Sequence, residues 1–383
     1  MKLITSESVS YGHPDKISDQ ISDLLLDAYL EKDENSRVAI ETMVKDNIVI
    51  VSGEVKSNAI IDVDPLIRNM VKEIGYCDPE HGFYYKNLTI MNLIGKQSNE
   101  INNAVVLEND ITAGDQGFMI GFATNETEEY MPIGMYVSRK IVNHVISITG
   151  FGPDAKSQTT VEVDSNDNVT RIHTILVSVC HKSEISVEDV RERIVFEINN
   201  NSMNLEKRIF DLFDNNLIIV VNPAGSWNVG GPVSDCGLTG RKIVVDQYGP
   251  YCPVGGGAFS GKDSSKVDRS GAYLARYIAK NIVASGIAKK CKVEIAYMIG
   301  VAEPASLSID TYGAADDEKL LKIVKMLFPL RPKQIIEKLN LKKPIYQQTA
   351  KYGHFGHKEY TWEQLDKAND ILRYYYPSSC NNG

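Results

Sequence analysis

The sequence predicts an α+β protein of three similar domains, each a sheet with helices on one face. One observation behind this prediction is an order of elements, helix then hairpin then helix, that recurs three times along the 383 residues. The other is the period of roughly 115–130 residues, which is too long for a solenoid repeat. We place the domains at residues 1–100, 112–229 and 230–370 and allow for strands exchanged between them.

In the first domain, apolar residues at helical spacing predict a helix over residues 15–31. Two segments on either side of Asp46-Asn47, which suits a two-residue turn, predict a hairpin of strands Arg37–Lys45 and Ile48–Val55. The hydrophobic pattern then predicts a second helix over Asp62–Ile74.

The other two domains repeat this order. The second has a predicted helix over Ile133–Ser147, strands Thr159–Val163 and Val169–Val179 around a turn-rich Asp164–Asn168, and a helix over Val187–Asn199. The third has a predicted helix over Val267–Val283, strands Lys292–Val301 and Ser306–Tyr312, and a helix over Asp317–Leu327. The repeat therefore covers most of the chain.

The composition is that of a globular protein, with 43% hydrophobic and 24% charged residues. No apolar run approaches the ~18 residues of a membrane span, and the first residues lack the apolar core of a signal peptide. We therefore expect no membrane association and a cytoplasmic location. The six cysteines are scattered without a CxxC pair, which indicates neither a thiolate zinc site nor a disulfide framework.

The net charge of −9 disfavours nucleic acid as a partner, because nucleic-acid binding needs a basic field. Six basic residues nevertheless lie between Arg241 and Arg276. A local basic cluster in an acidic chain indicates a site for a small polyanion. The alternative is a solvated basic face.

The segment Gly12–Lys16 opens the first predicted helix. Pro14 suits the first helical turn, where its missing N–H leaves no bond unmade, and free N–H groups at a helix N-terminus attract phosphate. Asp15 beside His13 and Lys16 fits a Mg²⁺–phosphate site, since Mg²⁺ is commonly held by one or two carboxylates and substrate phosphate. The alternative is that Asp15 only complements the helix dipole.

Two glutamates fall on one face of the first predicted hairpin. With Asp46-Asn47 as the turn, Glu41 faces Ser52, and Glu54 lies on the same face one diagonal away. Two carboxylates this close repel each other unless a cation or a polar ligand offsets the repulsion. The pair indicates a cation or ligand site, with a solvated outer face of the sheet as the alternative.

A glycine-rich loop runs over Gly255–Asp263. Residues Gly256–Lys262 match the GxxxxGK pattern of a P-loop, but Asp263 replaces the Ser or Thr that holds Mg²⁺ there. Pro250 and Pro253 also precede the loop where a P-loop has a central strand. A P-loop-like ATPase is therefore a rival hypothesis that these departures weaken.

The same loop still suits a polyphosphate. It leads to Lys262 and Lys266, and Ser265-x-x-Asp268 has the pattern of a helix capping box. Glycine backbone followed by lysines at a helix start forms a suitable cradle for phosphate groups.

Asp115 lies in the glycine-framed segment Ala113–Gly117, between two apolar stretches. It follows the polar segment Gln97–Asp110, which has little periodicity. One interpretation is a lid over a site. A plain surface loop is the other.

Taken together, these motifs resemble the S-adenosylmethionine synthetase family, and the match runs over nearly the whole chain. The matching motifs are Gly12–Lys16, Glu41-Thr42, Gly53-Glu54, Gly114–Gly117, Pro153–Gln158, Asp235–Lys242, Gly255–Asp263 and Lys266–Arg269. Several long motifs in the family's own order make the resemblance highly specific.

The resemblance implies three similar α+β domains about a pseudo-threefold axis. It also implies a tight homodimer, which pairs into a tetramer in one alternative, with active sites between facing subunits. The implied substrates are ATP and L-methionine, and the implied cofactors are Mg²⁺, two ions per site, and K⁺. In the implied reaction, the methionine sulfur displaces triphosphate from C5′ of ATP, and the triphosphate is hydrolysed to diphosphate and phosphate.

The resemblance also implies roles for single residues. The implied catalytic residues are His13, Lys156, Arg241, Lys242 and Lys262. The implied ATP-binding residues are His13, Asp154, Lys156, Trp227, Asp235, Arg241, Lys242, Ala258 and Lys262, with Trp227 stacked on adenine. The implied methionine-binding residues are Glu54, Gln97, Asp115, Asp235 and Lys266. The implied metal ligands are Asp15 and, more weakly, Asp268 for Mg²⁺, and Glu41 for K⁺.

A catalytically inactive ATP-binding relative is the last rival. Degenerate relatives usually lose the charged residues of the site first. This chain keeps His13, Asp15, Lys156 and the basic residues from Arg241 to Lys266. The sequence therefore favours an active enzyme.

Overall fold

The computed structural model describes residues 2–96, 106–107 and 110–377 of the chain. Its internal contacts divide the chain into two compact units. Unit 1 comprises Met1–Lys96, Ile133–Pro250 and Pro344–His354, and unit 2 comprises Gln97–Pro132, Tyr251–Lys343 and Phe355–Gly383.

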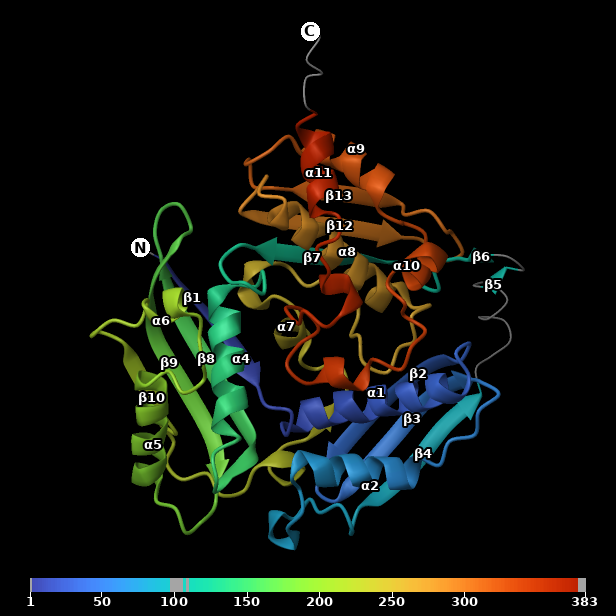
Figure 1. Cartoon of the computed structure of the whole chain (residues 1–383). Helices are drawn as coiled ribbons and strands as arrows, with labels where there is room; N and C mark the ends of the chain where they lie inside the picture. The colour runs from blue at the N-terminus through green and yellow to red at the C-terminus, as the bar shows by residue number, and fades with distance from the viewer. Residues whose placement is uncertain (1, 97–105, 108–109, 378–383) are drawn as a thin grey trace. The chain divides into compact units, whose positions relative to one another are not determined.

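Unit 1 contains two four-stranded sheets. The first, called the hairpin sheet here, has the order β11-β2-β3-β4. Its strands are Gly237–Leu238 (β11), Arg37–Lys45 (β2), Ile48–Lys56 (β3) and Thr89–Lys96 (β4). Helices α1 (Pro14–Lys32) and α2 (Val63–Ile74) lie along one face of this sheet (Figure 1). Buried residues alternate with exposed or half-buried ones along β2 and β3, as expected for a sheet covered on one side.

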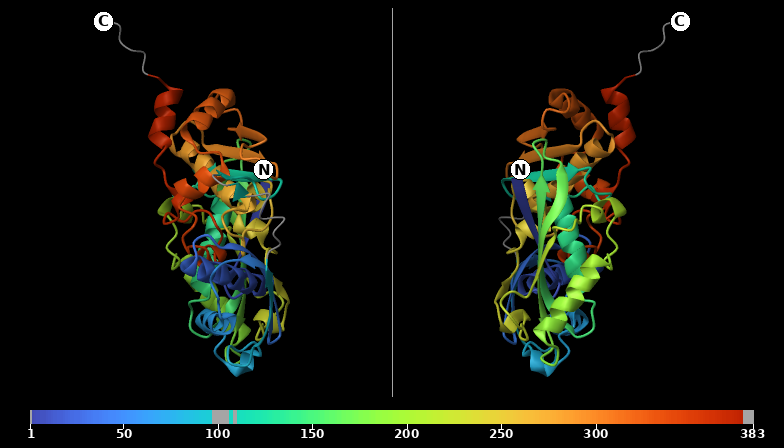
Figure 2. Two further views of the ribbon diagram at one scale, coloured as in Figure 1. Left: turned by 90° about the vertical axis from the view of Figure 1, so that its right-hand side faces the viewer. Right: turned by 90° about the vertical axis from the view of Figure 1, so that its left-hand side faces the viewer.

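The second sheet of unit 1, called the long sheet, has the order β1-β8-β9-β10. Its strands are Lys2–Val9 (β1), Phe151–Val163 (β8), Val169–His181 (β9) and Ile218–Val221 (β10). The first strand of the chain runs antiparallel beside β8 (Figure 2), with Val9 opposite Lys156. Helices α4 (Ile133–Val145), α5 (Val187–Asn199) and α6 (Lys207–Phe210) follow in this half of the unit, and α7 (Ile243–Asp246) comes after β11.

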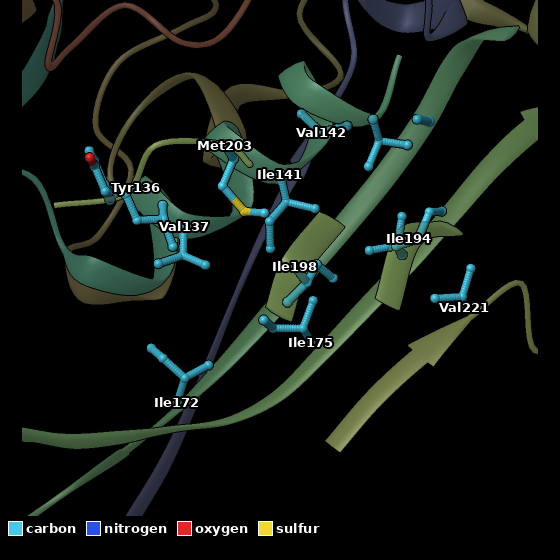
Figure 3. Packing of buried hydrophobic residues seen from close by; sticks show 14 of the residues in the cluster. Tyr136, Val137, Ile141, Val142, Ile172, Ile175, Ile194, Ile198, Met203 and Val221 are labelled. Carbon is cyan, nitrogen blue, oxygen red and sulfur yellow. The ribbon is translucent and has the colours of Figure 1, made fainter. Parts of the chain in front are cut away.

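One hydrophobic cluster joins the long sheet to its helices. Ile141 of α4, Ile175 of β9 and Ile194 of α5 are fully buried and face one another (Figure 3). Because all three belong to one cluster, α4 and α5 cover the same face of the sheet. Close packing of branched side chains in this cluster holds β8 and β9 in place.

Unit 2 is built on a three-stranded sheet with the order β13-β12-β7. Its strands are Gly117–Thr124 (β7), Lys290–Tyr297 (β12) and Ser306–Asp310 (β13), and a two-stranded ribbon pairs Val106–Leu107 (β5) with Asp110–Ile111 (β6). Its helices are Val267–Ala284 (α8), Asp317–Leu327 (α9), Pro332–Lys338 (α10) and Ala368–Tyr375 (α11). Among the described residues, no helix is both long and apolar enough to cross a lipid bilayer.

Helix α8 is buried along almost its whole length against β7 and β12. A Cβ on Gly121 of β7 would lie 2.0 Å from the carbonyl carbon of Ala275, so only glycine permits this approach. The buried guanidinium of Arg276 is compensated by both carboxylate oxygens of Glu363, each at 2.9 Å, and by the Phe122 carbonyl at 2.7 Å. A charge buried without such partners would destabilise the helix strongly.

The predicted α+β class and the helix–hairpin–helix elements are confirmed. Helices α5 and α9 have the predicted bounds, and the first hairpin has the predicted register, with Glu41 opposite Ser52. Within the described residues, the sequence patterns missed seven strands, namely β1, β4, β5, β6, β7, β10 and β11. Each of them is recognised only by its pairing with another strand, and a local sequence pattern does not report that pairing.

Several predicted strand bounds are wrong, including the end of β9, which is His181 rather than Val179, and the start of β12, which is Lys290 rather than Lys292. Strand β8 begins at Phe151 rather than Thr159, because the chain absorbs Pro153 at a shift in the β8–β9 register between Phe151 and Ala155. Strand β12 ends at Tyr297 rather than Val301, since Gly300 turns with φ +77°. Strand β13 ends at Asp310 because Tyr312 adopts φ +56°.

Candidate functional site

The loop between β1 and α1 places His13 at the N-cap of the helix. The backbone N–H of Asp15 donates to His13 Nδ1 at 3.1 Å, and Pro14 occupies the first helical turn. The Tyr76 hydroxyl donates to the Gly12 carbonyl at 2.7 Å. A Cβ on Gly12 would lie 2.4 Å from the Pro153 carbonyl oxygen, so this approach requires glycine.

His13 is a neutral imidazole at neutral pH. Burial, followed by the positive charges of Lys242 and Lys156, lowers its pKa to about 3. The Asp15 carboxylate at 4.0 Å from Nδ1 therefore makes no ion pair with the ring. Because Nδ1 accepts a hydrogen bond, the ring proton is on Nε2, which is a hydrogen-bond donor.

The Asp15 carboxylate connects α1 to β11 and to the basic residues that follow it. Its Oδ1 accepts the Leu238 N–H at 3.0 Å, and its Oδ2 accepts a hydrogen bond from the Lys242 ammonium. Burial opposes ionisation of Asp15, but the bonds from Lys242 and Leu238 outweigh burial and hold its pKa below the usual value. Asp15 is therefore an ionised carboxylate that faces a cation.

Strand β8 contributes Asp154 and Lys156 to the same part of unit 1. Asp154 Oδ2 accepts the Gly231 N–H at 2.8 Å, whereas its buried Oδ1 has no hydrogen-bond partner in the described residues. Burial, which outweighs the bond from Gly231 and the charges of Lys156 and Lys242, raises the pKa of Asp154 to about 6. The Lys156 side chain is exposed. The unpartnered Asp154 oxygen is available to a ligand donor.

Trp227 lies on a segment that His181 holds in place. The Trp227 N–H donates to His181 Nε2 at 3.3 Å, and the His181 N–H donates to the Trp227 carbonyl at 2.9 Å. The indole N–H of Trp227 donates to the Val229 carbonyl at 2.8 Å. Its ring remains half-buried. Farther along, Asp235 is exposed, with Oδ1 accepting the Cys236 N–H at 2.9 Å.

Glu41 and Glu54 lie on the outer face of the hairpin sheet, opposite the face that α1 and α2 cover. Glu41 stands opposite Ser52 and Glu54 opposite Ala39, which is the predicted diagonal pair. Both carboxylates are exposed, as are apolar side chains of the same face. These apolar side chains, with their exposed fractions, are Ile48 (41%), Met91 (45%) and Leu93 (58%). Contiguous exposed apolar surface of this kind is typical of an interaction site.

Unit 2 brings the glycine-rich loop against the start of α8. Lys262 Nζ lies 2.6 Å from Asp268 Oδ2, and the Gly257 N–H donates to Asp268 Oδ1 at 3.2 Å. The half-buried Ala258 lies in the same loop. Lys266 Nζ lies 2.5 Å from Asp263 Oδ2, so both lysines are paired with carboxylates. Asp115 is exposed just before β7, and its Oδ1 accepts the Gln116 N–H at 2.7 Å.

The predicted capping box at Ser265 is wrong. The N-cap of α8 is Lys266, and no side chain caps it; Asp268 is drawn instead to Gly257 and Lys262. The glycine loop also lacks the context of a P-loop, since the element before it is the 3₁₀ turn Gly249–Tyr251 rather than a strand. The loop thus holds Lys262 through Asp268 without P-loop geometry.

Unit 1 brings together six of the predicted residues through direct or electrostatic interactions, and these are His13, Asp15, Asp154, Lys156, Asp235 and Lys242. Unit 2 brings together Lys262, Asp268 and the glycine loop. Arg241 is exposed beside Lys242. Gln97 and the remainder of the predicted lid up to residue 105 lie outside the described residues.

Sequence reasoning missed the residues that support these side chains, above all Tyr76, Gly231 and His181. Each acts through one hydrogen bond to a partner remote in sequence, and no local pattern reports such a bond. Asp19 is different, because its spacing of four residues from Asp15 was visible. It is buried on α1 and accepts the Gly240 N–H at 2.9 Å.

Asp154 should make the stability of the protein depend on pH. Its folded-state pKa of about 6 lies above the usual 3.8, so the folded state keeps this proton longer than the unfolded state. Stability contributed by the protonated form is therefore lost as pH rises from about 4 to about 6. In urea titrations over this interval, Asp154→Asn should show a smaller decline in unfolding free energy than wild type. Asp62→Asn, at an exposed position of the same unit, should keep the wild-type decline, and an equal decline in Asp154→Asn would contradict a buried ionisable carboxyl.

Comparison with known proteins covers almost the whole chain. Residues 1–99, 110–227 and 229–364 match the N-terminal, central and C-terminal domains of S-adenosylmethionine synthetase, respectively. A solved structure of an unusual S-adenosylmethionine synthetase from Campylobacter jejuni is 39% identical, with a TM-score of 0.91 over 98% of this chain and 100% of that chain. The chain belongs to the S-adenosylmethionine synthetase family and is thereby a methionine adenosyltransferase.

Proposed function

We propose that the chain forms S-adenosylmethionine by direct attack of the methionine sulfur on C5′ of ATP. The whole triphosphate leaves and is then hydrolysed to diphosphate and phosphate. The observation that carries this proposal is the set of cations and N–H donors around Asp15 in unit 1. A thioether has no proton to lose, so the reaction needs no general base. It needs alignment of the reactants and stabilisation of charge on the leaving triphosphate.

His13 suits a position beside the oxygen that leaves C5′. Its ring is neutral and carries its proton on Nε2, so it donates a hydrogen bond without a full charge. Lys156, Arg241, Lys242 and Lys262 would surround the triphosphate and stabilise its growing charge. The remaining proposed ATP contacts are Asp154, Trp227, Asp235 and Ala258. Asp154 has a free carboxylate oxygen in the described residues, and Trp227 has a ring suited to stacking on adenine.

Methionine would bind through both of its charged groups. Glu54 and Asp235 are exposed carboxylates suited to its ammonium group, and Lys266 is suited to its carboxylate. Asp115 and Gln97 complete the proposed set. The product sulfonium is cationic, so carboxylates near the sulfur would stabilise it as it forms.

Two carboxylates of the described residues fit Mg²⁺ by the chemistry around them. Asp15 and Asp268 each direct one oxygen at an ammonium group, Lys242 and Lys262 respectively, and this supports a cation at both positions. No group of three or more His, Cys, Asp or Glu side chains converges within the part of the chain described. Asp15 and Asp268 would therefore each hold one Mg²⁺ together with phosphate oxygens. The bound ions would neutralise triphosphate charge.

Glu41 is proposed to hold K⁺. The carboxylate lies next to Glu54 on an exposed sheet face, where a cation would offset the repulsion between the two.

We further propose a homodimer whose partner chain completes each site. The outer face of the hairpin sheet combines Glu41 and Glu54 with exposed Ile48, Met91 and Leu93. Such a face is suited to burial against a second copy, and obligate interfaces usually exceed about 2,000 Å². A tetramer of two such dimers is the alternative assembly.

Lys262→Met should lower the rate of S-adenosylmethionine formation by roughly 100-fold or more, because it removes one preorganised charge from the leaving triphosphate. The assay follows phosphate and diphosphate released from ATP with and without methionine. Wild type should release both only with methionine, whereas an ATPase would release phosphate without it. Lys289→Met, at an exposed lysine before β12, is the matched control and should retain activity. Full activity in Lys262→Met would remove Lys262 from the mechanism.

Glu41→Gln should weaken activation by K⁺ and leave the Mg²⁺ dependence largely unchanged. The neutral amide removes the charge that attracts the cation but keeps the size of the side chain. The matched variant Glu54→Gln lies on the same face and should instead raise the KM for methionine. Titrations of each cation and of methionine separate the two effects. A wild-type K⁺ titration in Glu41→Gln would show that the cation lies elsewhere.

Inactive variants should complement each other across the proposed dimer. In a mixed dimer of Asp15→Ala and Lys262→Met, one site would carry both lesions and the other would be intact if the two residues serve one site from different chains. Such a dimer should regain up to about half of wild-type activity, as expected for an isologous pair with two equal sites. The measurement is activity after subunit exchange, with each variant alone as control. No recovery in proven mixed dimers would contradict shared sites.

A further inference from the structure

One buried face of α1 is turned toward the basic segment, defined here as Gly237–Lys242. Asp15, Asp19 and Ser22 stand at spacings of four and three residues, which places them on one side of the helix. All three are buried. Nothing in the reaction proposed above uses Asp19 or Ser22.

Three consecutive residues of the basic segment find partners on this face. The Leu238 N–H donates to Asp15 at 3.0 Å, and the Gly240 N–H donates to Asp19 Oδ1 at 2.9 Å. Between them, the Thr239 hydroxyl lies 2.8 Å from the Ser22 hydroxyl. The segment that leads into Arg241 is therefore bonded to α1 at every residue from 238 to 240, through backbone N–H groups at 238 and 240 and through the side chain at 239.

A buried ion network closes the far side of the segment. The second oxygen of Asp19 accepts the Lys16 ammonium at 3.0 Å, and Lys16 also donates to Asp246 at 2.5 Å. The backbone N–H of Asp246 donates to the Lys242 carbonyl at 2.8 Å. A closed circuit thus runs from Gly240 through Asp19, Lys16 and Asp246 back to Lys242.

We propose that Asp19 and Ser22 are positioning residues that hold Arg241 and Lys242 ready for triphosphate. This inference rests on the proposed role of these two basic residues. A segment whose backbone is ordered before the ligand arrives loses less conformational entropy on binding. Groups that act on developing charge also need placement to within a fraction of an ångström, supplied by a supporting layer of hydrogen bonds. The circuit through Lys16 supplies that layer without touching the ligand.

Asp19→Asn should break one of the two hydrogen bonds that the Asp19 carboxylate accepts. Asn has one accepting oxygen, so its NH₂ group must face either the Gly240 N–H or the Lys16 ammonium, and donor would oppose donor. Ser22→Ala removes the hydroxyl contacts to Thr239 and to Thr42, each at 2.8 Å. Glu197→Gln is the matched control, because Glu197 is a buried carboxylate of the same unit that pairs with His144 and Arg193 rather than with the basic segment.

The test measures binding of inorganic triphosphate to the folded protein by calorimetry, together with urea stability and hydrogen exchange of the basic segment. Asp19→Asn should bind triphosphate roughly ten- to a hundredfold more weakly, since small misplacements of charged groups have effects of this size. Ser22→Ala should bind severalfold more weakly and serves as the readout if Asp19→Asn does not fold. Exchange should rise selectively in residues 237–242 of both variants, and Glu197→Gln should keep wild-type affinity.

Two results would overturn the inference. Triphosphate affinity that falls in all three variants in proportion to lost stability would show a purely structural role. Unchanged triphosphate affinity in the folded Asp19 and Ser22 variants would show that the basic segment does not need its hydrogen bonds to α1 in order to bind triphosphate. In both cases, the proposed function would stand if wild type binds triphosphate and forms S-adenosylmethionine. A wild type that forms S-adenosylmethionine without measurable triphosphate binding would overturn the inference and the assigned role of Arg241 and Lys242, but not the overall reaction.

Discussion

Unit 1 depends on the contact between the first turn of α1 and β11. The Asp15 carboxylate accepts the Leu238 N–H and the Lys242 ammonium at once. There is no spare room at this contact, because a Cβ on Gly237 would lie 2.1 Å from the Pro14 carbonyl oxygen. Gly237 and Pro14 thus allow β11 and α1 to pack closely, and this packing places the charged residues beside them. The residues that hold α1 against β11 therefore also position the charged groups of the candidate site.

Burial sets the protonation of the groups around this contact. The same desolvation that makes His13 a neutral donor holds Asp154 near the point of protonation, whereas two hydrogen bonds keep Asp15 ionised. Three neighbouring groups therefore reach three electrostatic states from one local environment. For a reaction that builds negative charge on a leaving triphosphate, donors and cations matter more than a base, and the described residues supply them.

Local pattern predicted the elements whose information is local. The helix over residues 15–31 and the first hairpin follow from apolar spacing and the Asp46-Asn47 turn, and the Glu41–Ser52 pair follows from that turn alone. Strand β1 could not be predicted in the same way, because its partners lie in β8, where Val9 pairs with Lys156. An apolar run misled at Val301, where a glycine turn ends the strand.

The candidate site shows the same division. Gly12, Lys16 and Asp154 were found from motifs, whereas their partners were not, since Tyr76, Asp246 and Gly231 act from distant parts of the chain. Ser265 was misassigned as part of a cap because the carboxylate of Asp268 binds the glycine loop and Lys262 instead. A sequence motif reports which residue types recur, but the hydrogen-bond partner of a buried carboxylate is settled by packing.

The central claim is that the triphosphate leaves C5′ as one piece as the sulfur attacks. A single-turnover rapid-quench experiment tests it most directly, with enzyme in excess over ATP labelled in the γ-phosphate and saturating methionine. The account predicts that enzyme-bound triphosphate appears in step with S-adenosylmethionine and only then decays to diphosphate and phosphate. Labelled phosphate that appears before S-adenosylmethionine, or without methionine, would contradict it.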